Sequence, residues 1–173
     1  MKFNAYGNLD GGIIKGKTFE DVRKFFVDGF SDSQTRKRNF DGLIQLLEKY
    51  NEINLEDKSL TQLIDKYWID GSFTTLKPDP NDIDLVFFLN GAEESANATQ
   101  HIIKNSNPFH EFGKQFHCDT YFIINKDTIP ESFTDEKRHF DMLKKYWMGQ
   151  FGFDRNENPK GILEIDIPIT EEV

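Results

Sequence analysis

The amino-acid sequence predicts a single α/β (α+β) domain over residues 1–173, a small mixed sheet with flanking helices. Helical and strand-like segments alternate through the second half of the chain, and the strand-like segments are short, β-branched and aromatic. The chain has 173 residues, the size of one domain, and 17 of them are phenylalanine. This aromatic content excludes a disordered chain, because it is enough to build a buried core.

Apolar residues at helical spacing, with suitable caps, mark the expected helices. These lie at about residues 19–29, 34–50, 60–66, 93–104 and 137–148. Thr18 is a suitable N-cap for the first helix, and Gly29 is expected to end it. The basic cluster Arg36–Arg38 in the second helix is interpreted as a solvent-exposed face, with phosphate contact as the alternative. Residues 1–17 are rich in glycine and are expected to form an irregular N-terminal arm.

Segments rich in β-branched and aromatic residues mark the expected strands. These lie at residues 67–69, 83–89, 116–124 and 161–167. The segment Ile83–Leu89 is apolar apart from one aspartate, which is typical of a strand buried on both faces. Between the first two strands, Pro78 and Pro80 allow at most one helical turn after Ser72.

Charge and cysteine content limit the possible environments of the protein. The chain has 30 acidic against 21 basic residues, a net charge of −9, which is unfavourable for coating nucleic acid through an overall field. Its single cysteine, Cys118, cannot form an internal disulfide and favours a reducing compartment. The longest apolar run is Leu85–Leu89, far too short to cross a membrane. We therefore expect a cytoplasmic protein without a membrane partner.

The most informative segment runs from Gly71 to Asp84. Asp82 and Asp84 stand two residues apart at the start of a strand, so their carboxylates are expected on one face. Adjacent carboxylates repel one another unless a cation is bound, and such a pair is a usual oxygen-rich site for Mg²⁺. Gly71 and Ser72 open a helical turn after a strand, and the free N–H groups of such a turn suit a phosphate. Lys77, in the connecting loop, is a further candidate phosphate ligand.

A third carboxylate, Asp119, is the one acidic residue of the strand expected over 116–124. Strand alternation gives it the same face as His117 and Tyr121. If this strand pairs beside the strand that holds Asp84, three carboxylates converge on one edge of the sheet. Such a set could hold two cations roughly 3.5–4 Å apart, the arrangement used for phosphoryl and nucleotidyl transfer.

Other residues near these motifs receive structural interpretations. Asp79 and Asn81 are expected to be turn residues, and Cys118 a buried packing residue. Three aromatic residues are expected to pack in the core: Trp147, Phe151 and Phe153. Three histidines are interpreted as ordinary surface or partly buried residues: His101, His110 and His139. Arg155 and Lys160 are weaker candidates for a triphosphate contact.

Three alternative motifs fit the aspartates less well. The Asp-x-Asp motif of glycosyltransferases requires a nucleotide-binding α/β unit upstream, where only helices and one short strand are expected. The phosphatase signature of the haloacid dehalogenases has its apolar strand before the aspartates, whereas here the strand follows them. A calcium loop of the EF-hand type that starts at Asp79 fails, because Ile83 occupies a ligand position and Asp84 the position of the invariant glycine.

The order Gly71-Ser72, nine residues, Asp82-Ile83-Asp84 and a later strand with Asp119 resembles the DNA polymerase β-type nucleotidyltransferase superfamily. The segments that look closest to a poorly characterised branch of small bacterial and phage nucleotidyltransferase-like proteins are Trp68–Phe73, Lys77-Pro78, Asp82–Val86, Gly149–Arg155 and Asn158–Ile162. The resemblance covers the chain from about Phe40 to Ile167. It implies the nucleotidyltransferase fold for the mixed sheet.

The resemblance also implies roles for individual residues. Gly71 and Ser72 would hold phosphates of a nucleoside triphosphate. Asp82 and Asp84 would ligate two Mg²⁺ (or Mn²⁺) ions, and Asp119 would complete the metal site and help to activate an acceptor hydroxyl. Too few residues follow Asp119 for the large helical domain that holds the nucleobase and the acceptor in many relatives.

The predicted function is metal-dependent transfer of a nucleoside monophosphate from a triphosphate, such as ATP, to a hydroxyl acceptor. A protein side chain, an RNA 3′ end and a small molecule all remain open as acceptors. The resemblance alone implies a toxin–antitoxin or phage-defence setting. The alternative is a catalytically inactive binding module of the same fold that acts through a partner protein.

Overall fold

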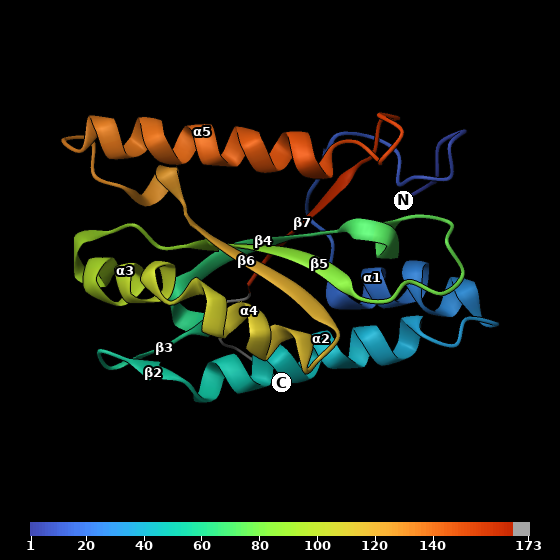
Figure 1. Cartoon of the computed structure of the whole chain (residues 1–173), viewed down its shortest axis with the longest axis horizontal. Helices are drawn as coiled ribbons and strands as arrows, with labels where there is room; N and C mark the ends of the chain where they lie inside the picture. Colours follow the sequence, from blue (N-terminus) through green and yellow to red (C-terminus); the bar gives the residue numbers. More distant parts are fainter. Residues whose placement is uncertain (168–173) are drawn as a thin grey trace.

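The computed structural model describes residues 1–167 and shows a five-stranded mixed sheet flanked by helices (Figure 1). The helices are α1 (Phe19–Phe26), α2 (Arg36–Glu52), α3 (Ala96–Lys104), α4 (Ser106–Lys114) and α5 (Thr134–Phe151). The strands of the sheet are β1 (Ile13–Ile14), β4 (Ile64–Asp70), β5 (Ile83–Leu89), β6 (Cys118–Ile124) and β7 (Ile162–Asp166). A separate hairpin contains β2 (Asn54–Leu55) and β3 (Lys58–Ser59). The predicted mixed α/β class is confirmed.

The strands lie in the order β1-β7-β4-β5-β6. β4 runs antiparallel to both of its neighbours, β5 and β7, whereas β6 runs parallel to β5 and β1 parallel to β7. The parallel pairing of β5 and β6 requires a crossover, which α3 and α4 supply. No helix within residues 1–167 is both long and apolar enough to cross a membrane.

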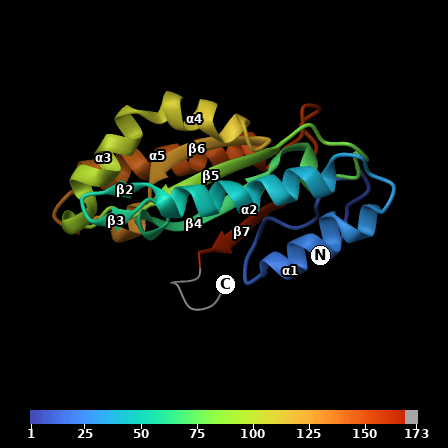
Figure 2. The ribbon, with the colours of Figure 1, turned by 90° about the horizontal axis from the view of Figure 1, so that it is seen from below.

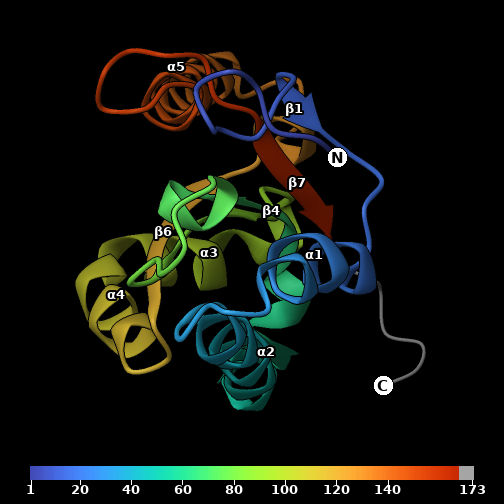
Figure 3. The same cartoon turned by 90° about the vertical axis from the view of Figure 1, so that its right-hand side faces the viewer.

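The two faces of the sheet bury different clusters of apolar side chains. On one face Ile83, Leu85 and Phe87 join the main core beneath α1 and α2. On the other face Val86 and Phe88 pack with residues of α5 in a smaller cluster. Figure 3 shows α5 on one side of the sheet and α1 and α2 on the other, and Figure 2 shows these two helices side by side. Because side chains alternate along a strand, Asp84 shares the α5 face with Val86.

Several of the predicted boundaries are confirmed by this structure. Thr18 caps α1 through a reciprocal pair of hydrogen bonds with Asp21. β5 spans the predicted residues, and the ends of α2 and β7 lie within two residues of prediction. The N-terminal arm is irregular apart from β1, but it is not loose, because Leu9 is fully buried and bonds Thr74 through its backbone.

Other boundaries differ from the prediction for local reasons. α1 ends at Phe26, and Gly29 lies in a following 3₁₀ turn. Only residues 61–63 of the helix expected over 60–66 are helical, because β4 begins at Ile64 to pair with Leu89. α5 is longer than expected at both ends, and α4 was not predicted at all. Its Pro108 lies within the first turn of the helix, where proline removes no intrahelical hydrogen bond.

The interpretation of Arg36 as an exposed residue is wrong, although Lys37 and Arg38 are exposed. Arg36 is fully buried. Its guanidinium donates hydrogen bonds of 2.6–3.0 Å to the backbone carbonyl oxygens of Phe26, Phe73, Thr75 and Lys77. The same group lies 3.7 Å above the ring of Phe30, and burial lowers its pKa to about 10. Arg36 thus joins the end of α1 to the loop between β4 and β5.

This arrangement predicts that Arg36→Lys lowers the free energy of unfolding by roughly 2–4 kcal/mol. A lysine ammonium cannot donate to four carbonyl groups in this planar arrangement, and each buried carbonyl left without a donor is costly. Lys37→Met, at the neighbouring exposed position, is the control and should change stability by less than about 0.5 kcal/mol. Urea unfolding would measure both, and equal stability of Arg36→Lys and the wild type would contradict the role of Arg36.

Candidate functional site

The pairing of β4, β5 and β6 brings acidic residues to one end of the sheet. Asp84 lies opposite Asp70 on β4 and opposite Asp119 on β6. Asp82 precedes β5 by one residue. The predicted pairing of the Asp119 strand beside the Asp84 strand is therefore confirmed, and the carboxylates meet at one edge.

All six predicted site residues border one cavity of about 720 Å³. They are Gly71, Ser72, Lys77, Asp82, Asp84 and Asp119. Most of the remaining wall comes from α5 and the loop that follows it, including Trp147, Gln150, Phe151, Phe153, Arg155 and Lys160. The cavity therefore lies between the carboxylate edge of the sheet and the C-terminal end of α5.

The carboxylates of this cavity form a concentrated negative charge. Burial, which is the largest cause, and the neighbouring Asp82 and Asp119 together raise the pKa of Asp84 from 3.8 to about 6. Lys160 and Arg155 act in the opposite sense, since each lowers the pKa of Asp84. The site thus has more negative charge than its own cations compensate.

Gly71 begins the short 3₁₀ turn Gly71–Thr74 at the end of β4, as the two prolines led us to expect. Its φ angle is +77°, and a Cβ atom at this position would lie 1.7 Å from Oδ2 of Asp84. Only glycine allows the turn and the carboxylate to approach so closely. The turn therefore places Gly71 and Ser72 directly beside Asp84.

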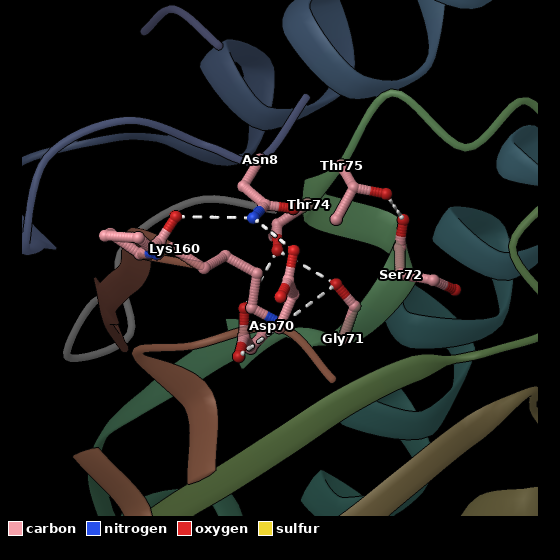
Figure 4. A network of polar contacts seen from close by, with 9 residues as sticks. Asn8, Asp70, Gly71, Ser72, Thr74, Thr75 and Lys160 are labelled. Atoms are coloured by element: carbon pink, nitrogen blue, oxygen red, sulfur yellow. Dashed lines mark hydrogen bonds and ion pairs between the residues drawn. The ribbon is translucent and has the colours of Figure 1, made fainter. Parts of the chain in front are cut away.

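Asp70 and Lys160 form a buried pair behind this turn (Figure 4). Asp70 is fully buried and accepts a hydrogen bond of 2.9 Å from Oγ1 of Thr74. Its other oxygen lies 3.1 Å from Nζ of Lys160 as an ion pair, without the alignment of a hydrogen bond. Nζ of Lys160 is also 3.5 Å from the carbonyl oxygen of Gly71. The ammonium of Lys160 is thereby held at the wall of the cavity.

Asp119 is engaged by two neighbours. Nε2 of His110 lies 3.1 Å from Oδ1 of Asp119, and the hydroxyl of Tyr121 donates to Oδ2 at 2.9 Å. Nδ1 of His110 is 3.0 Å from the carbonyl oxygen of Thr120. His110 is partly buried, as interpreted, but its contact with Asp119 was not expected, because α4 was not predicted. Tyr121 shares a face of β6 with Asp119, as expected. His117 does not, because it precedes the strand and has a φ angle of +58°.

A second cavity, of about 380 Å³, lies beside the first and shares Asn81, Asp82 and Asp119 with it. Its other lining residues are His110, Lys114, His117 and Cys118. Cys118 is buried as predicted, so it is a packing residue with a thiol pKa raised by burial. The carboxylate edge can therefore be approached from two directions.

The residues interpreted as structural divide into two groups. Asp79 accepts hydrogen bonds from Ser33 and from the backbone of Gln34, so its structural interpretation is confirmed. Phe151 is buried in the smaller apolar cluster. The expectation of core packing is wrong for Phe153, which is 49% exposed at the cavity.

We predict that the free energy of unfolding in metal-free buffer falls as the pH rises from about 4 to about 7. Burial raises the pKa of Asp70 from 3.8 to about 7. In this window the folded state therefore keeps a proton that the unfolded state has released, and this advantage disappears at higher pH. Asp70→Asn should flatten the decline, whereas the exposed Asp57→Asn should retain it. Urea unfolding across the range would decide, and parallel profiles for Asp70→Asn and wild type would refute the prediction.

Comparison with known proteins gives a family but no activity. No curated protein and no solved structure matches the chain significantly. One family model, described as a family of unknown function (DUF6932), matches residues 1–166. Because this match extends over nearly the whole chain, the protein belongs to the DUF6932 family.

Proposed function

We propose that this protein has the nucleotidyltransferase fold and is a metal-dependent nucleotidyltransferase. It would move a nucleoside monophosphate from a triphosphate, such as ATP, to a hydroxyl acceptor. The observation that carries the proposal is that Asp82, Asp84, Asp119 and the Gly71–Ser72 turn all border the same cavity. These residues come from separate strands and loops, and they lie together at one end of the sheet, on the face that α5 covers.

The donor chemistry of the carboxylates suits a hard divalent cation. Asp82, Asp84 and Asp119 offer oxygen ligands, which Mg²⁺ and Mn²⁺ prefer. The raised pKa of Asp84 shows that the ionised carboxylate is poorly compensated, as is typical of a site that binds a cation. Within residues 1–167 no three acidic, histidine or cysteine side chains are already arranged as a metal-binding group, so side chains must rotate to bind. A bound cation would neutralise charge that develops on the reacting phosphates.

The protein's own groups would position the triphosphate. Backbone N–H groups at Gly71 and Ser72 would bind its terminal phosphates. Lys160, Arg155 and Lys77 border the same cavity and would balance the phosphate charge. Asp84, held against Gly71, would hold a cation between the carboxylate edge and the phosphates.

The second cavity offers a route for the acceptor. In-line displacement requires the acceptor oxygen and the leaving pyrophosphate to lie on opposite sides of the α-phosphate. Asp119 borders both cavities and would accept the proton of the acceptor hydroxyl. The new bond would join that oxygen to the α-phosphorus, the bond from the α-phosphorus to the bridging oxygen would break, and pyrophosphate would leave.

The inactive binding module is the second candidate, and one observation favours it. His110 and Tyr121 contact both oxygens of Asp119, which competes with any metal or proton at that carboxylate. A module of this kind would bind nucleotide through Gly71 and Ser72 without turnover, and it would act through a partner protein.

Transfer of label from α-³²P-labelled nucleoside triphosphates tests the proposed activity. The purified protein would be incubated with Mg²⁺ or Mn²⁺ and a host lysate that contains RNA, protein and small molecules. We expect label on one acceptor class with the wild type and none with Asp82→Asn or Asp84→Asn. Asp79→Asn, an exposed turn residue of the same loop, is the matched control and should transfer like the wild type. Absence of transfer from wild type that still binds nucleotide and metal would favour the inactive module.

Asp84→Asn is also expected to stabilise the metal-free protein. At pH 8 the gain should be on the order of 1–3 kcal/mol, because the amide removes a buried charge that Asp82 and Asp119 repel. The same substitution should abolish the rise in melting temperature that Mg²⁺ and nucleoside triphosphate cause together. Calorimetry would measure both effects. A metal-free Asp84→Asn protein less stable than wild type would show that the carboxylate has a structural role instead.

A further inference from the structure

The larger cavity has two walls of different chemistry. One wall contains the three carboxylates and the Gly71–Ser72 turn. The opposite wall contains three aromatic side chains, Trp147, Phe151 and Phe153, and two amides, Gln150 and Asn156. The proposed function uses the first wall and the cations, and it leaves the aromatic wall without a role.

The aromatic wall is held in a fixed relation to the carboxylates. The ring of Trp147 lies 4.4 Å from that of Tyr121 and 5.5 Å from that of Phe151, as centroid distances. Tyr121 donates its hydroxyl to Asp119, which belongs to the carboxylate edge. A group that rests on Trp147 would therefore sit at a defined distance from the reacting phosphate.

Phe153 lies on an ordered loop rather than a loose one. Its backbone forms a bridge with Pro159 across the loop. Next to it, the Asp154 carboxylate accepts hydrogen bonds from the backbone N–H groups of Asn156 and Asn158, at 2.9 and 3.0 Å. The amide of Asn8 donates to Asp154 at 3.0 Å and ties the loop to the N-terminal arm. The loop is thus held in one conformation by these hydrogen bonds, yet Phe153 remains 49% exposed at the cavity.

An exposed aromatic ring contributes little to the free energy of folding, because much of its apolar surface stays in water. The same ring gains from a planar ligand, since stacking of a base on an aromatic side chain contributes about 1–3 kcal/mol. The volume of about 720 Å³ also lies within the usual range for small-molecule sites. The wall is therefore suited to a flat heterocycle attached to a triphosphate.

We propose that Trp147 and Phe153 form the nucleobase subsite of this protein, with a preference for purines. The inference rests on the proposed function, because it assigns the base of the same triphosphate that Gly71 and Ser72 would hold. Purines offer more stacking area than pyrimidines, and the amides of Gln150 and Asn156 line the same wall for polar contacts with the base. The end of α5 and its loop would thus do the work of a separate base-binding domain.

The test compares two probes in the presence of Mg²⁺ by calorimetry. One is α,β-methylene ATP, which resists transfer, and the other is inorganic tripolyphosphate, which lacks a base. For the wild type we expect tighter binding of the nucleotide, and weaker binding of α,β-methylene CTP than of its ATP counterpart. Phe153→Ala should weaken binding of the ATP analogue by roughly 5- to 100-fold and leave tripolyphosphate unchanged. Phe153→Tyr should restore it.

Met142→Ala is the matched control, because Met142 is an exposed apolar residue of α5 outside the cavity. It should leave both affinities unchanged. Unchanged nucleotide affinity in Phe153→Ala, or equal losses for both probes, would overturn the base subsite. Tripolyphosphate binding without any gain from the base would overturn the subsite alone. Failure of the wild type to bind either probe would overturn the proposed function with it.

Discussion

The register of β5 between β4 and β6 is the constraint on which the candidate site depends. It sets Asp84 opposite Asp70 on one side and opposite Asp119 on the other. A slip of one residue would move Asp84 to the opposite face of the sheet, into the main core. Ile83, Leu85 and Phe87 prevent this slip, because they are fully buried beneath α1 and α2. Burial of the apolar side chains of β5 thus offsets the electrostatic cost of its one aspartate.

The loop that carries the Gly71–Ser72 turn is held in place by buried polar groups behind it. Arg36 bonds three carbonyl groups of residues 73–77 and one at the end of α1. Asp70 and Lys160 form the second anchor, and the N-terminal arm adds a third through the backbone contact of Leu9 with Thr74. These contacts come from segments far apart in the chain, so the turn is fixed by the whole domain. A rigid turn is what recognition of phosphate requires, since mobile N–H groups would lose entropy on binding.

The features of the site that could be predicted are those that depend on short local sequence patterns. Asp82 and Asp84 are two residues apart at the start of a strand, and Gly71-Ser72 follows a strand. Pairing of these neighbouring strands was therefore the only further assumption needed to place them at one edge. Arg36 was misjudged because its cluster looks like any exposed basic face, and its four acceptors are backbone groups that leave no mark in a sequence. The contact of His110 with Asp119 could not be predicted without α4. That helix was missed because Pro108 and Gly113 are residues that usually disfavour a helix. Of the three aromatic residues expected in the core, only Phe153 was misread, because the sequence does not show that α5 ends at Phe151 and leaves Phe153 on the following loop.

The position of α5 explains how, under the proposed function, this chain would surround a triphosphate. α5 covers the same face of the sheet that carries the carboxylates, and Phe151 anchors its end in the smaller apolar cluster. Beyond this anchor, the loop turns back to β7 and places Lys160 beside Gly71. Any ligand held by the turn therefore meets residues of α5 on its other side, while the second cavity stays open beyond Asp119. Under the proposed chemistry, α5 would thus close the donor side of the site and leave the second cavity free for the acceptor to enter.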